Sequence, residues 1–216
     1  MRLDEDACFL MLSGDDFSLP GSVHGSVALR NETNNQSKDL LAWVQLPMNA
    51  ETIREYLEHD HHRLDHLLSS AASDPNEIER GAFAEFRLGL LKHISMEEKI
   101  LLPAVQALRH GEPLQIAAQL RLQHGAIAAL LVPSPRSAVV KALKAVLAKH
   151  NAIEEGSDGV YAECDRIVGP ELVVVLSRLQ AAAEVPAASH VDSEKVEASA
   201  RRALTRAGFD ANLISD

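Results

Sequence analysis

The sequence predicts an all-α protein built around an antiparallel, up-down-up-down four-helix bundle. Apolar residues recur every three or four positions in four stretches between residues 50 and 155, which is the period of an amphipathic helix. Short Pro- and Gly-containing connections separate these stretches, so consecutive helices should run antiparallel. We expect an irregular extension over residues 1–47, the bundle over residues 48–168 and additional C-terminal helices over residues 169–216.

Composition and charge exclude several classes of function. A formal charge of -10 over 216 residues argues against binding to a phosphate backbone, so no nucleic-acid partner is expected. Cys8 and Cys164 lie far apart in the sequence and form neither a disulfide framework nor a thiolate metal site. No apolar run is long enough for a membrane span, and the N-terminus does not resemble a signal peptide. The sequence therefore predicts a cytoplasmic protein without a membrane partner.

The N-terminal extension has no sustained periodicity. Residues Ser13 to Asp39 are crowded with Gly, Asn, Ser and Asp, which favours a mobile segment. The stretch from Leu40 to Leu46 contains Trp43 and offers the alternative of a flap packed on the bundle. His24 lies among glycines without a partner at ligand spacing, so we interpret it as solvated.

The first helix is expected from Ala50 to Ala72, with Asn49 as its N-cap. A complete start signal precedes the second helix, because Asp74 can cap, Pro75 suits the first helical position and Glu77 the capping-box position. This helix should end near Arg109 and bend at Pro103 without ending there. Its core-facing positions are Phe83, Phe86, Leu90, His93, Glu97 and Ile100.

The third and fourth helices repeat this pattern. The third is expected from Pro113 to just before Pro133, with core-facing Ile116, Leu120, His124, Ile127 and Leu131. The fourth should begin with Ser134 as cap and Pro135 at its first position, with core-facing Val139, Leu143, Val146, His150 and Ile153. Glu154 follows His150 by one turn, as Glu97 follows His93. Histidines thus take apolar positions on three successive helices.

The first helix offers four histidines, of which only one should face the bundle axis. At about 100° per residue from Ile53, the apolar residues of this helix centre near 30° and His61 lies near 80°. His59, His62 and His66 lie roughly between 180° and 240° on the same wheel, turned toward solvent. We therefore expect His61 in the core.

Four helices that each turn a histidine toward a common axis predict a metal site. Buried carboxylates and imidazoles lower stability unless something pairs them. A bound cation is the pairing that helix bundles with inward Glu and His use. The expected ligands are His61, His93, Glu97, His124, His150 and Glu154.

These residues resemble the hemerythrin-like family, the HHE cation-binding domains, over about residues 50–165. The resemblance rests on Asp60-His61-x-x-Leu64-Asp65, His93-Ile94-x-x-Glu97-Glu98-x-x-Leu101-Leu102-Pro103, His124 and His150-Asn151-x-x-Glu154-Glu155. It implies two non-haem iron ions with terminal imidazoles and bridging carboxylates, and manganese suits such donors less well than iron. Family members with a His-Asp-x-His sequence can use the first histidine, which would nominate His59 in place of His61.

The resemblance also separates oxygen carriers from other members. Carriers have a second histidine one turn from the third-helix ligand, where this chain has Leu120 and Ala128. Four histidines and two glutamates are similar to the set of di-iron proteins linked to iron-sulfur repair and nitrosative stress, although the cysteine-containing domain of those proteins has no counterpart in residues 1–47. The Gly156–Gly159 segment interrupts the fourth helix and makes Asp158 a further candidate ligand.

Three functions fit this ligand set. The first is a protein that binds or senses oxygen, nitric oxide or iron, with a small diatomic ligand as its partner. The second is a di-iron enzyme acting on peroxide or dioxygen, or an iron donor in cluster repair, although no catalytic residue is identified. The third is an interaction protein with a vestigial site. Beyond the bundle we expect an apolar helix from Gly169 to Ala183 and a last helix, capped by Asp192 or Ser193, that is a solvated surface helix or docks a protein partner.

Overall fold

The computed structural model describes residues 52–74 and 77–215, and all regular structure within them is helical. The predicted extension over residues 1–47, with His24, lies outside the described residues. The helices are α2 (Ile53–Ala71), α3 (Arg80–Met96), the π turn η1 (Glu97–Leu101), α4 (Leu102–Leu108), α5 (Ala117–Leu130), α6 (Ser137–Glu155), α7 (Val160–Val168), the 3-10 turn η2 (Gly169–Glu171), α8 (Leu172–Gln180), α9 (Glu194–Arg206) and the 3-10 turn η3 (Ala211–Ile214). The all-α prediction is confirmed for this part of the chain. None of its helices is long and apolar enough to cross a membrane.

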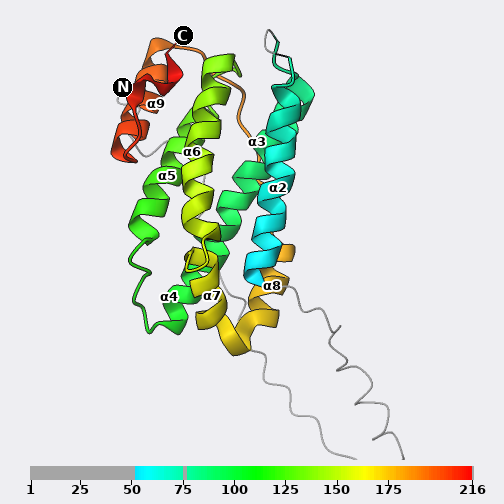
Figure 1. Cartoon of the computed structure of the whole chain (residues 1–216), viewed down its shortest axis with the longest axis vertical. Helices are drawn as coiled ribbons and strands as arrows, with labels where there is room; N and C mark the ends of the chain where they lie inside the picture. The colour runs from blue at the N-terminus through cyan, green and yellow to red at the C-terminus, as the bar shows by residue number, and fades with distance from the viewer. Residues whose placement is uncertain (1–51, 75–76, 216) are drawn as a thin grey trace, which may run out of the picture.

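The four predicted helices correspond to α2, to α3 with η1 and α4, to α5, and to α6. Figure 1 shows these long segments lying lengthwise beside one another, with α9 against one end of the molecule and α7 and α8 at the other. This arrangement allows one face of each long helix to meet the others in the interior.

Helix α2 begins later than the sequence predicts. Its N-cap is Thr52, whose side chain accepts from the backbone N–H of Glu55 while the Glu55 carboxylate accepts from the N–H of Thr52. A reciprocal capping box satisfies two helix N–H donors, so α2 starts here, and the predicted cap Asn49 and first residue Ala50 lie outside the described residues.

The second predicted helix also starts later, at Arg80 and not at Pro75. Glu79 is the N-cap, and its carboxylate accepts from the N–H groups of Gly81 and Ala82. The backbone N–H of Glu79 donates to Ala71 O at 2.9 Å and ties the start of α3 to the end of α2. This contact between helices overrides the local start signal at Asp74, Pro75 and Glu77.

The helix continues through Pro103, as predicted, by means of the π turn η1. Pro103 lacks the N–H that would donate within the helix, and the N–H of Leu102 donates to Glu97 O, five residues back. The extra residue in this turn shifts the buried face. Leu101 is 1% exposed, whereas the predicted core residue Ile100 is only partly buried.

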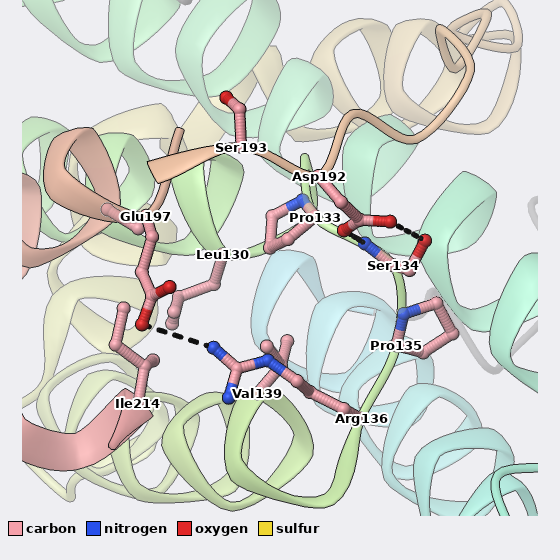
Figure 2. Close-up of a pocket in the computed structure, with 11 residues that line it drawn as sticks. Leu130, Pro133, Ser134, Pro135, Arg136, Val139, Asp192, Ser193, Glu197 and Ile214 are labelled. Carbon is pink, nitrogen blue, oxygen red and sulfur yellow. Dashed lines mark hydrogen bonds and ion pairs between the residues drawn. The ribbon is translucent and has the colours of Figure 1, made fainter. Parts of the chain in front are cut away.

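Helices α5 and α6 begin after their prolines, and both predicted starts are wrong. Helix α5 starts at Ala117, four residues after Pro113, and α6 at Ser137, with Arg136 as its N-cap. Ser134 does not cap α6, because its N–H and hydroxyl donate to the two carboxylate oxygens of Asp192 at 2.8 and 2.6 Å. Figure 2 shows this pair beside the ion pair of Arg136 with Glu197.

The C-terminal helices pack on the long ones. Ser193 caps α9 as predicted, and Ala200 and Leu204 of α9 are completely buried in one core with residues of α5 and α6. The apolar face of α9 is therefore covered by this chain itself. In α8 only Val175 and Leu179 are buried, while Val173 and Val174 are about half exposed, so only one face of this apolar helix is covered.

Two separate apolar clusters form the interior. One lies toward α9 and is built around Leu68, Phe86, Leu130 and Leu143. The other lies toward α7 and α8 and is built around Leu57, Leu101 and Leu120. Along α2 the change from one cluster to the other falls between Leu57 and Leu64, so His61 lies at the level between them.

Candidate metal centre

A buried polar layer lies between the two apolar clusters. It contains all six predicted ligands, none of them more than 5% exposed, namely His61, His93, Glu97, His124, His150 and Glu154. They come from α2, α3, η1, α5 and α6. Burial on this scale requires each polar atom to have a partner, because an unpaired buried charge lowers stability by several kcal/mol.

The imidazoles form two pairs, which we call the His61–His93 half and the His124–His150 half. The ring centroids are 4.4 Å apart in the first pair and 4.8 Å apart in the second. One ligand atom each from Glu97, His124, His150 and Glu154 lies within 4.8 Å of the others, a spacing that could hold a metal ion.

The two glutamates lie between the halves. Glu97 directs Oε1 to the Nε2 of His93 at 3.6 Å and Oε2 to the Nε2 of His124 at 3.1 Å. Glu154 presents Oε2 to the Nε2 of His61 at 3.6 Å and to the Nε2 of His150 at 3.1 Å. Each carboxylate thus faces one imidazole of each half.

Two atoms at the centre lack a hydrogen bond. They are Glu97 Oε2 and His124 Nε2, both completely shielded from solvent and 3.1 Å apart. His124 donates its Nδ1–H to Glu98, so without a second proton on the ring the bare lone pair of Nε2 would face a carboxylate oxygen. Two facing lone pairs repel unless a positive charge lies between them. A metal cation fits this donor set.

Every inner histidine has an outer acceptor on its Nδ1. The Nδ1 of His61 donates to Glu155 at 2.6 Å and that of His93 to Asp60 at 2.9 Å. His124 donates to Glu98 at 2.7 Å, and His150 to the amide oxygen of Gln123 at 2.9 Å. These bonds fix the tautomer and turn each Nε2 inward, as is usual for metal-bound histidine.

The acceptors follow a cyclic order around the helices. Asp60 of α2 holds His93 of α3, and Glu98 of η1 holds His124 of α5. Gln123 of α5 holds His150 of α6, and Glu155 of α6 holds His61 of α2. Each acceptor is adjacent in sequence to a ligand of its own helix, so every helix supplies ligands and also orients the histidine of the next helix.

The charges of the layer shift its pKa values in opposing directions. Burial lowers the pKa of His93, but Glu97 and Asp60 outweigh burial and raise it to about 9. Burial also lowers the pKa of His124, but the nearby carboxylates of Glu97 and Glu98 outweigh burial and raise it to about 9. Burial and the charge of His124 lower the pKa of His150 to about 3.

The pKa values of the two glutamates are also shifted in opposite directions. Burial raises the pKa of Glu97, but His93 and His124 outweigh burial and hold it well below the usual value. Burial and the negative charge of Glu97 hold the pKa of Glu154 well above its usual value. Without a cation the layer therefore favours protons on His93, His124 and Glu154, and a cation at the centre would displace them.

The remaining predicted candidates lie away from the centre. His59, His62 and His66 are exposed on α2, as the helical wheel predicts. Asp158 is exposed in the Gly156–Gly159 turn and does not join the layer.

Five residues of the site lie outside the predicted ligand set, namely Asp60, Glu98, Gln123, Glu155 and Tyr161. Four of them are the outer acceptors, and their common sequence feature is a position directly beside a ligand. Tyr161 is completely buried and places its hydroxyl against the His61–His93 half, with hydrogen-bond contacts to both histidines and both glutamates. Burial and the charges of Glu154 and Glu97 raise its pKa well above the usual value.

The chain shows no recognisable relatives in three comparisons. No family model, no curated protein and no solved structure matches it. The case for a function therefore rests on the residues and geometry of the polar layer.

Proposed function

We propose that this chain is a hemerythrin-like protein that holds two non-haem iron ions and binds a small diatomic ligand, oxygen or nitric oxide. In this proposal α2, α3 with η1 and α4, α5 and α6 form the antiparallel four-helix bundle of that family. The observation that carries the proposal is the polar layer, in which four histidines held by outer acceptors turn Nε2 toward two shared glutamates.

The division of the donors supports two ions over one. Glu97 offers one oxygen to each half, and Glu154 Oε2 faces a histidine of each half. The four histidines would be terminal ligands, two for each ion, and the glutamates would bridge. Paired ions bridged by inward carboxylates of a helix bundle are an established arrangement for iron and manganese.

The chemistry of the donors supports iron. Imidazole with carboxylate suits iron, and manganese prefers a site richer in oxygen. The one cysteine among the described residues, Cys164, is buried, and burial raises its thiol pKa, so it does not supply a thiolate.

The surroundings of the layer support a small ligand. Bound iron would supply an open coordination position for a diatomic molecule. The apolar clusters on both sides keep bulk water from the carboxylates, and all six ligands are at most 5% exposed. Two surface pockets of the protein, beside Arg109 and beside Asp192, contain none of the ligands. A diatomic molecule fits such a site better than a larger substrate does.

Anaerobic loading with ferrous iron, followed by exposure to air, tests the proposal. We expect about two iron ions per chain, as in paired-metal bundles, and an optical spectrum that changes when oxygen is admitted. A chain that retains no iron after gel filtration would contradict the proposal. Sustained turnover of hydrogen peroxide by the loaded protein would favour the enzymatic alternative over a binding protein.

A further inference from the structure

Tyr161 is the one hydroxyl-bearing side chain among the described residues that reaches the centre of the polar layer. Its hydroxyl lies 2.6 Å from Glu97 Oε1 and 3.2 Å from Glu154 Oε2. It also lies 3.2 Å from His61 Nε2 and 3.3 Å from His93 Nε2. Three of these four atoms belong to or face the His61–His93 half, and Glu154 Oε2 faces a histidine of each half.

These distances are those between neighbouring ligands of a single ion. Nitrogen and oxygen ligands lie about 2.0 to 2.2 Å from a first-row divalent ion, so two ligands at right angles are roughly 3 Å apart. The tyrosine oxygen has this separation from four donor atoms at once. A hydroxyl that only donates one hydrogen bond needs one such neighbour.

The backbone fixes Tyr161 in this place. A Cβ on Gly159 would lie 2.5 Å from Glu154 O and 2.8 Å from Ile153 O, so only glycine permits the tight turn that ends α6 and starts α7. Farther along α7, the Asp165 carboxylate accepts from the N–H groups of Ile53 and Arg54 at the start of α2. Helix α7 is therefore anchored to α6 and to α2, the helices that carry Glu154 and His61.

The His124–His150 half has no equivalent donor in the described part of the chain. Its additional polar neighbour, Gln123, accepts from the Nδ1 of His150, on the outer side of the ring. The second tyrosine of the sequence, Tyr56, packs against the apolar cluster beside α7. The two halves thus differ by one inward oxygen.

We propose that Tyr161 is a direct ligand, as phenolate, of the iron ion held by His61 and His93. The inference rests on the proposed di-iron function and adds a fifth protein ligand to one ion. On binding, the phenol O–H bond breaks, its proton passes to water, and the oxygen lone pair forms the bond to iron. No electron is transferred in this step, and the cation offsets the negative charges of Glu97 and Glu154 around the phenolate.

The test is the visible and resonance Raman spectrum of the ferric protein, because phenolate bound to ferric iron has a charge-transfer band and enhanced ring vibrations. Wild type, Tyr161→Phe and Tyr56→Phe are loaded with ferrous iron without oxygen, oxidised in air, and analysed for iron per chain. We expect the phenolate signature in wild type and in Tyr56→Phe, whose single remaining tyrosine is Tyr161. Tyr161→Phe should lose the signature and retain both ions.

The iron analysis separates failure of this inference from failure of the proposed function. Wild type with two ions and no phenolate vibrations would overturn the tyrosine ligand and leave the di-iron site standing. Wild type without iron would overturn both. If Tyr161→Phe does not fold, Tyr56→Phe decides alone, because loss of its signature contradicts the ligand role of Tyr161 and retention supports it.

Discussion

The His61–His93 half and the His124–His150 half share both glutamates but differ in their surroundings. The first half has two outer carboxylates, Asp60 and Glu155, and the inward hydroxyl of Tyr161. The second half has one outer carboxylate, Glu98, and the neutral amide of Gln123. More negative charge and one more oxygen favour a higher positive charge on the metal, so we infer that the two ion sites are not equivalent.

The largest expected effect on iron content comes from replacing Glu97, a carboxylate that the two halves share. In the proposed di-iron site Glu97 bridges both ions, so replacing it by glutamine should lower the iron content from about two ions per chain toward none. Elemental analysis after gel filtration measures the change. Glu85→Gln, on the exposed face of α3, is the matched control and should retain both ions. A Glu97→Gln protein with full iron content would remove Glu97 from the site.

Loss of one histidine should empty one half only. His61→Ala and His124→Ala are each expected to reduce the iron content by about one ion per chain, because the opposite half keeps its own pair of imidazoles. His59→Ala changes an exposed neighbour and should leave the content unchanged. If His59→Ala lost iron while His61→Ala retained it, the assignment of the first-helix ligand would be wrong.

Each half contains one histidine whose pKa is raised to about 9, His93 in the first and His124 in the second. A histidine whose pKa is higher in the folded than in the unfolded protein stabilises the fold. This contribution is complete at pH values below the unfolded pKa of about 6.5, and it disappears as the pH rises through about 9. We therefore expect the metal-free protein to unfold at lower denaturant concentration at pH 9 than at pH 6.5. The shifts correspond to about 3 kcal/mol for each histidine at most.

Bound iron should reverse the pH dependence of the stability against unfolding. Metal-bound imidazole carries no proton on the coordinating Nε2, so His93 and His124 contribute no such loss in the loaded protein, and iron affinity should increase with pH over the same range. Denaturation curves of both forms at pH 6.5 and 9 make the comparison. Equal loss of stability in both forms would show that these histidines do not bind the metal.

Substitutions of the outer acceptors should have the smallest effect on iron binding. Glu155→Gln weakens the acceptor of His61, and we expect about tenfold faster loss of one ion to a chelator, in line with other outer-sphere changes. Gln123→Glu gives His150 the carboxylate that the other three histidines have, so the second ion should be lost more slowly. Opposite changes in two kinetic phases would confirm that the halves are distinct; equal rates throughout would contradict it.

Helix starts show why part of the fold was not predictable. Pro75, Pro113 and Pro135 each suit the first position of a helix, yet α3, α5 and α6 begin later. Glu79 is tied to Ala71 on the preceding helix, and Ser134 donates to Asp192, 58 residues away. Partners that are distant in sequence compete with the local signal, and the sequence does not show which of them meet.

Periodicity in the sequence was enough to predict which face of each long helix is turned inward. A helix repeats every 3.6 residues, so the spacing of apolar residues predicted buried positions for His61, His93, Glu97, His124, His150 and Glu154, all of which are buried. The packing of the helices was needed to show that Asp60, Glu98, Gln123 and Glu155 hold histidines of neighbouring helices and that Tyr161 reaches the centre. Those contacts depend on how helices are rotated against each other and how the chain turns at Gly159, which periodicity within one helix does not specify.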